Sequence, residues 1–202
     1  MKSIAKMVTT SYEVKHSRFE ARLYPVFALD EALEILSEIN QTFADASHRS
    51  YAYIIGENQE HQKANDDGEP SQTAGMPILE VLKKNAVTNV LCVVIRYYGG
   101  IKLGAGGLIR AYAKGATLTL EEASFTRKVM VVTLDVIAAF DHIGVLEHLI
   151  KAETLLERSY GEKVTFRLKL KKEALKSFIS LVEEKTQGQA QFRILKEEKT
   201  YQ

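Results

Sequence analysis

The residues best suited to chemistry in this sequence lie in a glycine-rich segment, residues 96–114, with the sequence RYYGGIKLGAGGLIRAYAK. Five of the twelve glycines of the chain fall within it, and glycine permits positive φ and close backbone approach. A helix that opens directly after such a turn has first N–H groups without an internal partner, at the positive end of its dipole. Unpaired amides of this kind bind anions.

Basic and aromatic side chains accompany these glycines. Residues 81–120 contain no Asp or Glu but six Lys or Arg, which creates a local positive field that the net charge of +1 hides. Tyr97, Tyr98 and Tyr112 are interleaved with the cations and can stack on bases. We therefore predict a nucleic-acid or anion site formed by Arg96, Tyr98, Gly99, Gly100, Lys102, Gly104, Gly106, Gly107, Arg110 and Lys114.

The spacing of the glycines restricts the class of phosphate site. A P-loop has Lys and then Ser or Thr directly after its closing glycine, whereas Ala105 follows Gly104. The dinucleotide fingerprint places a glycine at the position occupied by Ile109. We expect neither a nucleoside triphosphate nor an NAD site. The alternative is that the glycines serve only a sharp turn and tight helix packing.

A second group of polar residues lies in the segment NDDGEPSQTAGMP, residues 65–77. Its carboxylates can contact a partner or substrate, hold a hard cation such as Mg²⁺, or form an ordinary turn and helix cap. His48 precedes a predicted strand and is either a general base or a hydrogen-bonded structural residue. We predict that partner or substrate contacts are made by His48, Asp66, Asp67, Glu69 and Ser71, with no catalytic residue and no bound metal.

Composition excludes several classes of protein. The chain is 46% hydrophobic and 26% charged, which rules out disordered and collagen-like sequences. Its single cysteine, Cys92, cannot form an internal disulfide and lies in an apolar strand, where a thiol acts as a small apolar group. The longest apolar run, residues 90–95, is too short to cross a bilayer. We expect a soluble, cytoplasmic protein that does not contact a membrane.

Two α+β patterns position these residues. In the first, we predict strands at 18–27, 51–55 and 90–96, and helices at 30–43, 77–84 and 108–122. Asp30 is the expected N-cap of the first helix, Leu33, Leu36 and Ile39 form its inner face, and residues 56–75 are expected to be a loop.

The second pattern begins after a short polar linker at residues 123–128. Strands are predicted at 129–134, 154–159, 163–170 and from 192, with helices at 141–151 and 173–185. The order βαββαβ is that of a ferredoxin-like unit. We predict two domains, residues 1–126 and 127–202.

Three segments together are similar to the IMPACT/YigZ family, namely SRFEARLYPV, DDGEPSQTAGMPIL and VVIRYYGGIKLGAGGLIRAY. The resemblance covers nearly the whole chain and implies a first domain like domain IV of elongation factor G, a left-handed βαβ fold, and a second like its ferredoxin-like domain V. Ser50 stands where the family commonly has cysteine, which argues against shared cysteine chemistry. Gln72 and Met76 also depart from the family pattern.

The same resemblance implies a role in translation. Eukaryotic members regulate translation by binding the activator of an eIF2α kinase, and bacterial members are proposed to bind nucleic acid or the ribosome. We therefore expect a non-enzymatic RNA- or ribosome-binding protein without a cofactor. Two alternatives stay open: a divalent-metal-dependent hydrolase or phosphotransferase built on Asp66, Asp67, Glu69 and His48, and a protein-interaction module that docks an acidic partner.

Overall fold

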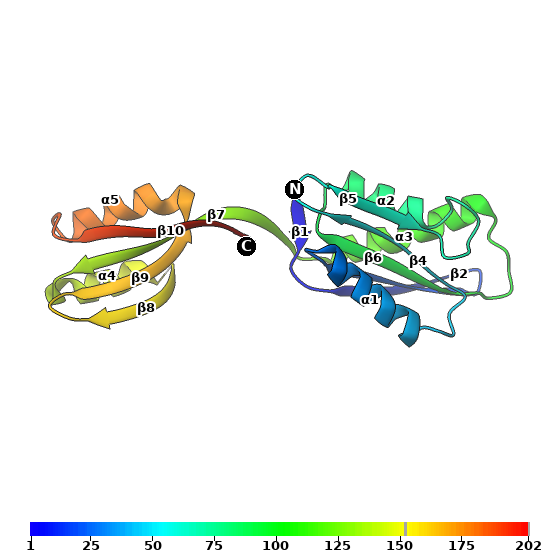
Figure 1. Cartoon of the computed structure of the whole chain (residues 1–202), viewed down its shortest axis with the longest axis horizontal. Helices are drawn as coiled ribbons and strands as arrows, with labels where there is room; N and C mark the ends of the chain where they lie inside the picture. Colours follow the sequence, from blue (N-terminus) through cyan, green and yellow to red (C-terminus); the bar gives the residue numbers. More distant parts are fainter. Residues whose placement is uncertain (152, 202) are drawn as a thin grey trace. The chain divides into compact units, whose positions relative to one another are not determined.

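The computed structural model describes residues 1–151 and 153–201. The chain forms two compact units, Met1–Thr126 and Arg127–Gln202 (Figure 1). Both units combine helices with an antiparallel sheet, so the α+β fold class predicted from the sequence is confirmed. Within the described residues, every helix is too short or too polar to cross a lipid bilayer.

The first unit is built on a sheet of five antiparallel strands with β6 at its centre. In spatial order the strands are β2 (Val8–Val14), β3 (Ser17–Pro25), β6 (Val90–Tyr97), β4 (His48–Ile55) and β5 (His61–Asn65). A short strand, β1 (Lys2–Ile4), precedes them.

Helices cover both faces of this sheet, which explains why residues 90–95 of β6 are all apolar. Cys92 and Val94 pack under α2 (Gly75–Lys84) and α3 (Ala105–Glu122). The alternate side chains, Leu91, Val93 and Ile95, pack under α1 (Leu29–Thr42) on the other face (Figure 1). The central strand therefore divides the unit into two cores.

Strands β1 and β2 are not predicted from the sequence, and the predictions for this unit differ from the structure in other places as well. Residues 56–75 are not all loop, because β5 pairs with β4 along the sheet edge. The sequence of β5, HQKAN, is polar since the strand is largely exposed, so no apolar alternation marks it. The N-cap of α1 is Ala28 rather than Asp30, and Leu33 is 48% exposed while Ala32 takes its place in the core.

The second unit has the predicted βαββαβ order. Its elements are β7 (Phe125–Ala138), α4 (Ile143–Ile150), β8 (Thr154–Tyr160), β9 (Val164–Lys171), α5 (Leu175–Lys185) and β10 (Gln191–Tyr201). The spatial order β10-β7-β9-β8, antiparallel throughout, is the ferredoxin-like arrangement. Alternate residues of β9 from Val164 to Leu170 are buried and pack in one core with Leu146, Phe178 and Val182.

Candidate functional site

The acidic loop after β5 and the glycine-rich turn before α3 meet at one cavity of about 420 Å³. We call it the β6–α3 cavity. Antiparallel pairing explains this meeting, because His48 at the start of β4 lies opposite Arg96 near the end of β6. The residues that line it are His48, Glu69, Pro70, Arg96, Tyr98, Lys102, Leu103, Gly104, Ala105 and Leu108. Residues from both predicted groups thus share one site.

Two glycines determine the backbone conformation of the turn between β6 and α3. A side chain at Gly99 would place its Cβ 2.0 Å from the backbone carbonyl of His16, so this position requires glycine. Gly104 has φ 69° and ψ 164°, a conformation that residues with a Cβ avoid. Because the turn ends there, α3 begins at Ala105, three residues earlier than predicted.

The N-terminus of α3 is open to the cavity. Gly104 is the N-cap residue and provides no side-chain hydrogen bond. The N–H of Leu108 donates to the Gly104 carbonyl at 2.9 Å, so the amides of residues 105–107 precede the first hydrogen bond within the helix. Gly106 and Gly107 therefore belong to the first helical turn rather than to the loop.

Arg96 and Glu69 form a buried ion pair at the base of the site. Arg96 Nη1 donates to Glu69 Oε1 at 2.7 Å, and the Tyr112 hydroxyl donates to the same oxygen at 2.7 Å. The side chains of Arg96 and Glu69 are only 5% and 3% exposed. Burial, and then the Glu69 carboxylate, raise the pKa of Tyr112 well above its ordinary value.

This geometry changes the role of two predicted residues. Arg96 is predicted from the sequence to contribute positive charge to an anion site, but its charge is balanced inside the protein by Glu69. Tyr112 is fully buried and cannot stack on a base. Tyr98, by contrast, is 48% exposed and lines the cavity.

His48 is held in a defined orientation. Its Nδ1 lies 2.8 Å from the Asp67 carbonyl oxygen, and a carbonyl only accepts, so Nδ1 carries a proton. The other ring nitrogen, Nε2, lies 3.8 Å from Glu69 Oε2. This nitrogen is left without a hydrogen bond to Glu69 and is available to a ligand.

Asp66 and Asp67 bind the protein's own backbone. Asp66 accepts hydrogen bonds from the N–H groups of Gln72, Ala74 and Gly75, at 2.8–3.0 Å, and so caps α2. Asp67 accepts the Arg49 N–H at 2.7 Å. Neither carboxylate lines the β6–α3 cavity.

The remaining features of the acidic loop offer little for metal binding. Ser71 is exposed on the loop. Gly68, with φ 84°, follows Asp67 as expected for a turn. Across residues 1–151 and 153–201, no cluster of three or more His, Cys, Asp or Glu has the arrangement to hold a metal ion.

The predicted exposed cations are divided between two adjacent depressions. Lys102 lines the β6–α3 cavity, whereas Arg110 and Lys114 line a depression of about 170 Å³ that also includes Gly107. Leu103 lines both. The second depression adds Lys15, which the sequence analysis missed because only the β2–β3 hairpin brings it beside α3.

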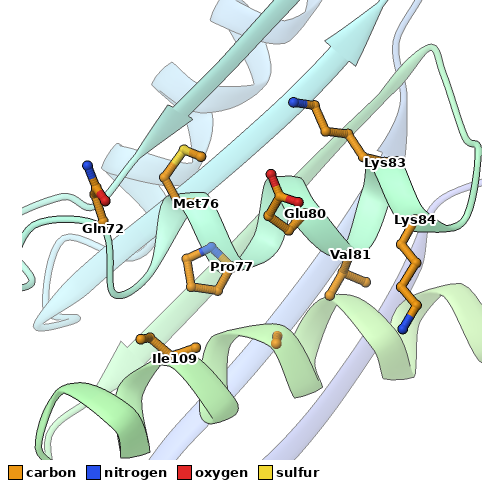
Figure 2. Close-up of a pocket in the computed structure, with 9 residues that line it drawn as sticks. Gln72, Met76, Pro77, Glu80, Val81, Lys83, Lys84 and Ile109 are labelled. Carbon is orange, nitrogen blue, oxygen red and sulfur yellow. The ribbon is translucent and has the colours of Figure 1, made fainter.

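A third depression, of about 750 Å³, runs between α2 and α3. Figure 2 shows Pro77 of α2 opposite Ile109 of α3, with Val81 farther along α2 toward the end that carries Lys83 and Lys84. Ile109 is 43% exposed and Met76, also in the lining, is 37% exposed. We call this feature the α2–α3 groove.

Cys92 takes no part in any of these sites. It is completely buried in β6, and burial raises its pKa to about 12. The prediction that it acts as a small apolar group is confirmed.

Comparison with known proteins agrees with this two-unit organisation. Residues 15–120 match the Impact N-terminal domain, and residues 136–189 match a domain of unknown function, DUF1949. A crystal structure described as that of a hypothetical protein has 28% sequence identity and a TM-score of 0.62, over 98% of each chain.

Two curated relatives each match more than half of the chain. IMPACT family member YigZ of Escherichia coli is 37% identical over 126 residues, 61% of this chain and 62% of that protein. IMPACT family member YvyE of Bacillus subtilis is 38% identical over 182 residues, which is 89% of this chain and 84% of YvyE. A match of this extent, together with the Impact N-terminal domain, shows that the chain belongs to the IMPACT family.

Proposed function

We propose that this protein is a non-enzymatic, cytoplasmic RNA- or ribosome-binding protein that acts in the regulation of translation. One observation carries the proposal: four exposed cations line the two adjacent depressions beside the first half of α3, namely Lys15, Lys102, Arg110 and Lys114. Three of them lie in the acid-free residues 81–120, so no carboxylate from that segment competes with a phosphate. The family resemblance supports the link to translation.

Contacts of this kind give a measurable dependence on salt. Lys and Arg on phosphates position a nucleic acid without reading its sequence, and each neutralised phosphate releases counterions. With four phosphate contacts on a single strand, log K falls with a slope of about −3 against log salt. Raising the salt fourfold, from about 50 to 200 mM, then weakens binding about 60-fold.

The test is fluorescence anisotropy of a labelled single-stranded RNA at these two salt concentrations. The Lys102→Ala/Arg110→Ala variant should bind at least tenfold more weakly at low salt and lower the slope by about 1.4. Lys6→Ala/Lys63→Ala is the matched control, since it removes two exposed positive charges from the same unit outside the site. Equal binding by wild type and the Lys102/Arg110 variant would exclude this surface.

The ribosome arm uses sedimentation of the full chain with purified ribosomal subunits. Co-sedimentation that is lost in the Lys102→Ala/Arg110→Ala variant supports a ribosomal RNA target. RNA binding without co-sedimentation indicates that the target is an RNA outside the ribosome.

A protein partner is the second candidate, favoured by the α2–α3 groove. Its exposed apolar residues, Met76 and Ile109, share the groove with Lys83 and Lys84 at the other end, which suits an apolar segment with acidic residues on one side. The Met76→Ser/Ile109→Ser variant distinguishes the two candidates. If the basic surface is the functional one, this variant should still bind RNA. If instead the wild type does not bind RNA and the variant loses a protein partner that the wild type retains, docking in the groove is favoured.

The metal-dependent enzyme is less well supported. His48 and Glu69 share the β6–α3 cavity with the glycine-rich turn, but the Asp66 and Asp67 carboxylates do not line it and are already bound to backbone N–H groups. Calorimetry with millimolar Mg²⁺ and Mn²⁺ is the check, and heat from stoichiometric binding would revive this alternative.

A further inference from the structure

We propose that the β6–α3 cavity binds a nucleoside phosphomonoester, either a free mononucleotide or the 5′-phosphorylated terminal nucleotide of an RNA. This inference goes beyond the proposed function, which needs only exposed cations that touch internal phosphates. The cavity volume of about 420 Å³ lies in the range of small-ligand sites, about 300–1,000 Å³.

The phosphate end of the site is the N-terminus of α3. Three amides precede the first helical hydrogen bond, and the first of them belongs to Ala105, which lines the cavity. The helix is 18 residues long, so its dipole is well developed. No atom lies within 4 Å of the place where a Cβ on Gly104 would stand, so an oxygen can approach this backbone. Lys102 adds a full positive charge in the same cavity wall.

One residue of the cavity wall, Arg96, carries a buried donor without an acceptor. Arg96 lines the cavity with its side chain 5% exposed, and its Nε–H finds no acceptor among the described residues. A buried N–H that is left unpaired is costly, and native proteins rarely tolerate one. Glu69 already balances the charge of Arg96, so it does not repel an incoming anion.

The nucleoside end is formed by Tyr98, Pro70 and Leu108. Tyr98 is half-exposed in the cavity wall, and its backbone N–H donates to Ser47 Oγ at 3.0 Å, which fixes the position of its backbone. An exposed tyrosine ring is a stacking platform for any base. His48 Nε2 and Glu69 Oε2 lie in the same cavity and can accept hydrogen bonds from ribose hydroxyls or base N–H groups.

The charge of the site favours a monoester over an internal diester. A phosphomonoester carries about −1.5 to −2 near neutral pH and has three terminal oxygens, whereas a diester carries −1 and has two. The positive end of the α3 dipole and the charge of Lys102 both stabilise the additional negative charge of the monoester. The site is therefore expected to distinguish the end of a strand from its interior.

The experiment compares two RNAs of identical sequence, one with a 5′-phosphate and one with a 5′-hydroxyl, by anisotropy with the full chain. AMP, GMP, CMP and UMP are titrated in parallel by calorimetry, with inorganic phosphate as a separate titrant. If the ligand is an RNA end, we expect the 5′-phosphorylated RNA to bind at least tenfold more tightly than the 5′-hydroxyl RNA. If the ligand is a free nucleotide, we expect the mononucleotides to bind at least tenfold more tightly than inorganic phosphate.

Matched variants assign the effect to the cavity. Ala105→Asp places a carboxylate at the first position of α3, where it suits the helix but repels phosphate, so the preference should disappear. Ala105→Asn has nearly the same shape without the charge and should keep most of the preference. Lys6→Ala/Lys63→Ala removes two exposed charges of the same unit that line none of the three depressions, so it should leave the ratio of the two affinities unchanged.

Each outcome is decisive. Mononucleotide binding without preference for the RNA end assigns a free nucleotide, and the reverse assigns the RNA terminus. Equal affinity for both RNAs without nucleotide binding overturns the inference while leaving the proposed RNA function intact. If the protein binds nucleotides but no RNA, the inference is supported and the proposed RNA function is overturned. Inorganic phosphate that binds as tightly as the nucleotides overturns the nucleoside part.

Discussion

Replacement of Glu69 by glutamine tests the buried ion pair on which the site is built. Glu69→Gln keeps the shape of the side chain but removes its charge, so Arg96 is left as an uncompensated cation with a side chain 5% exposed. Removing one partner of a buried pair costs about 3–5 kcal/mol. Because Arg96 lines a cavity that water can enter, we expect the lower end, about 3 kcal/mol.

A loss of about 3 kcal/mol in the free energy of unfolding should lower the Tm of the first unit by a readily measured amount. For a unit of 126 residues, the entropy of unfolding is about 0.26 kcal/mol/K, so 3 kcal/mol lowers its Tm by about 11 °C. The Glu69→Gln/Arg96→Met double variant should lose less than the sum of its single variants, since it leaves no charge stranded.

Hydrogen exchange in the full chain is the appropriate assay, because the two units can unfold separately and a single global transition is not assured. The amides of Val93 and Val94, in central β6, report on the first unit. A loss of about 3 kcal/mol should speed their exchange by more than 100-fold.

A surface pair supplies the control for this measurement. Glu157→Gln removes the exposed partner of Arg167 in the second unit and should leave the β6 amides unchanged. If Glu69→Gln speeds exchange of the β6 amides less than fivefold, water already stabilises Arg96 and the argument from burial is refuted.

Three further predictions concern other parts of the chain. Asp66→Ala removes the acceptor for three backbone N–H groups at the start of α2 and should cost about 2 kcal/mol, measured by hydrogen exchange of the α2 amides; unchanged protection would mean that water replaces the cap. Cys92 has a pKa of about 12 and should resist thiol reagents at pH 8 until guanidinium unfolds the protein, whereas labelling of the native protein would contradict its burial. Lys196 and Lys169 lower the pKa of Glu198 to about 2, so its contribution to stability is present above pH ~4.5 and is lost as the pH falls toward 2. Carbon-detected NMR should find the Glu198 midpoint well below 4, and a midpoint near 4.5 would show that these lysines are not close in solution.

Much of the fold could be predicted from the sequence because its signals are local. The uninterrupted apolar run of β6 indicates a strand covered on both faces, and Pro77 indicates the first turn of α2. In the second unit, alternation in β9 and the turn at Gly161 are enough to give the ferredoxin-like order. The glycine-rich turn and its cations are also visible at this level, since five glycines within nine residues disfavour one continuous helix or strand over the whole segment, although Gly106 and Gly107 lie in the first turn of α3.

The site itself was decided by tertiary structure. Glu69 and Arg96 are 27 residues apart and are not joined by any local pattern, yet strand pairing between β4 and β6 brings the acidic loop over the end of β6. The same packing buries Arg96, which the sequence presents as one cation among several, and brings Lys15 beside α3. Local periodicity records which face of an element is apolar, whereas the pairing of charges depends on which chain ends meet, and only the assembled sheet determines that.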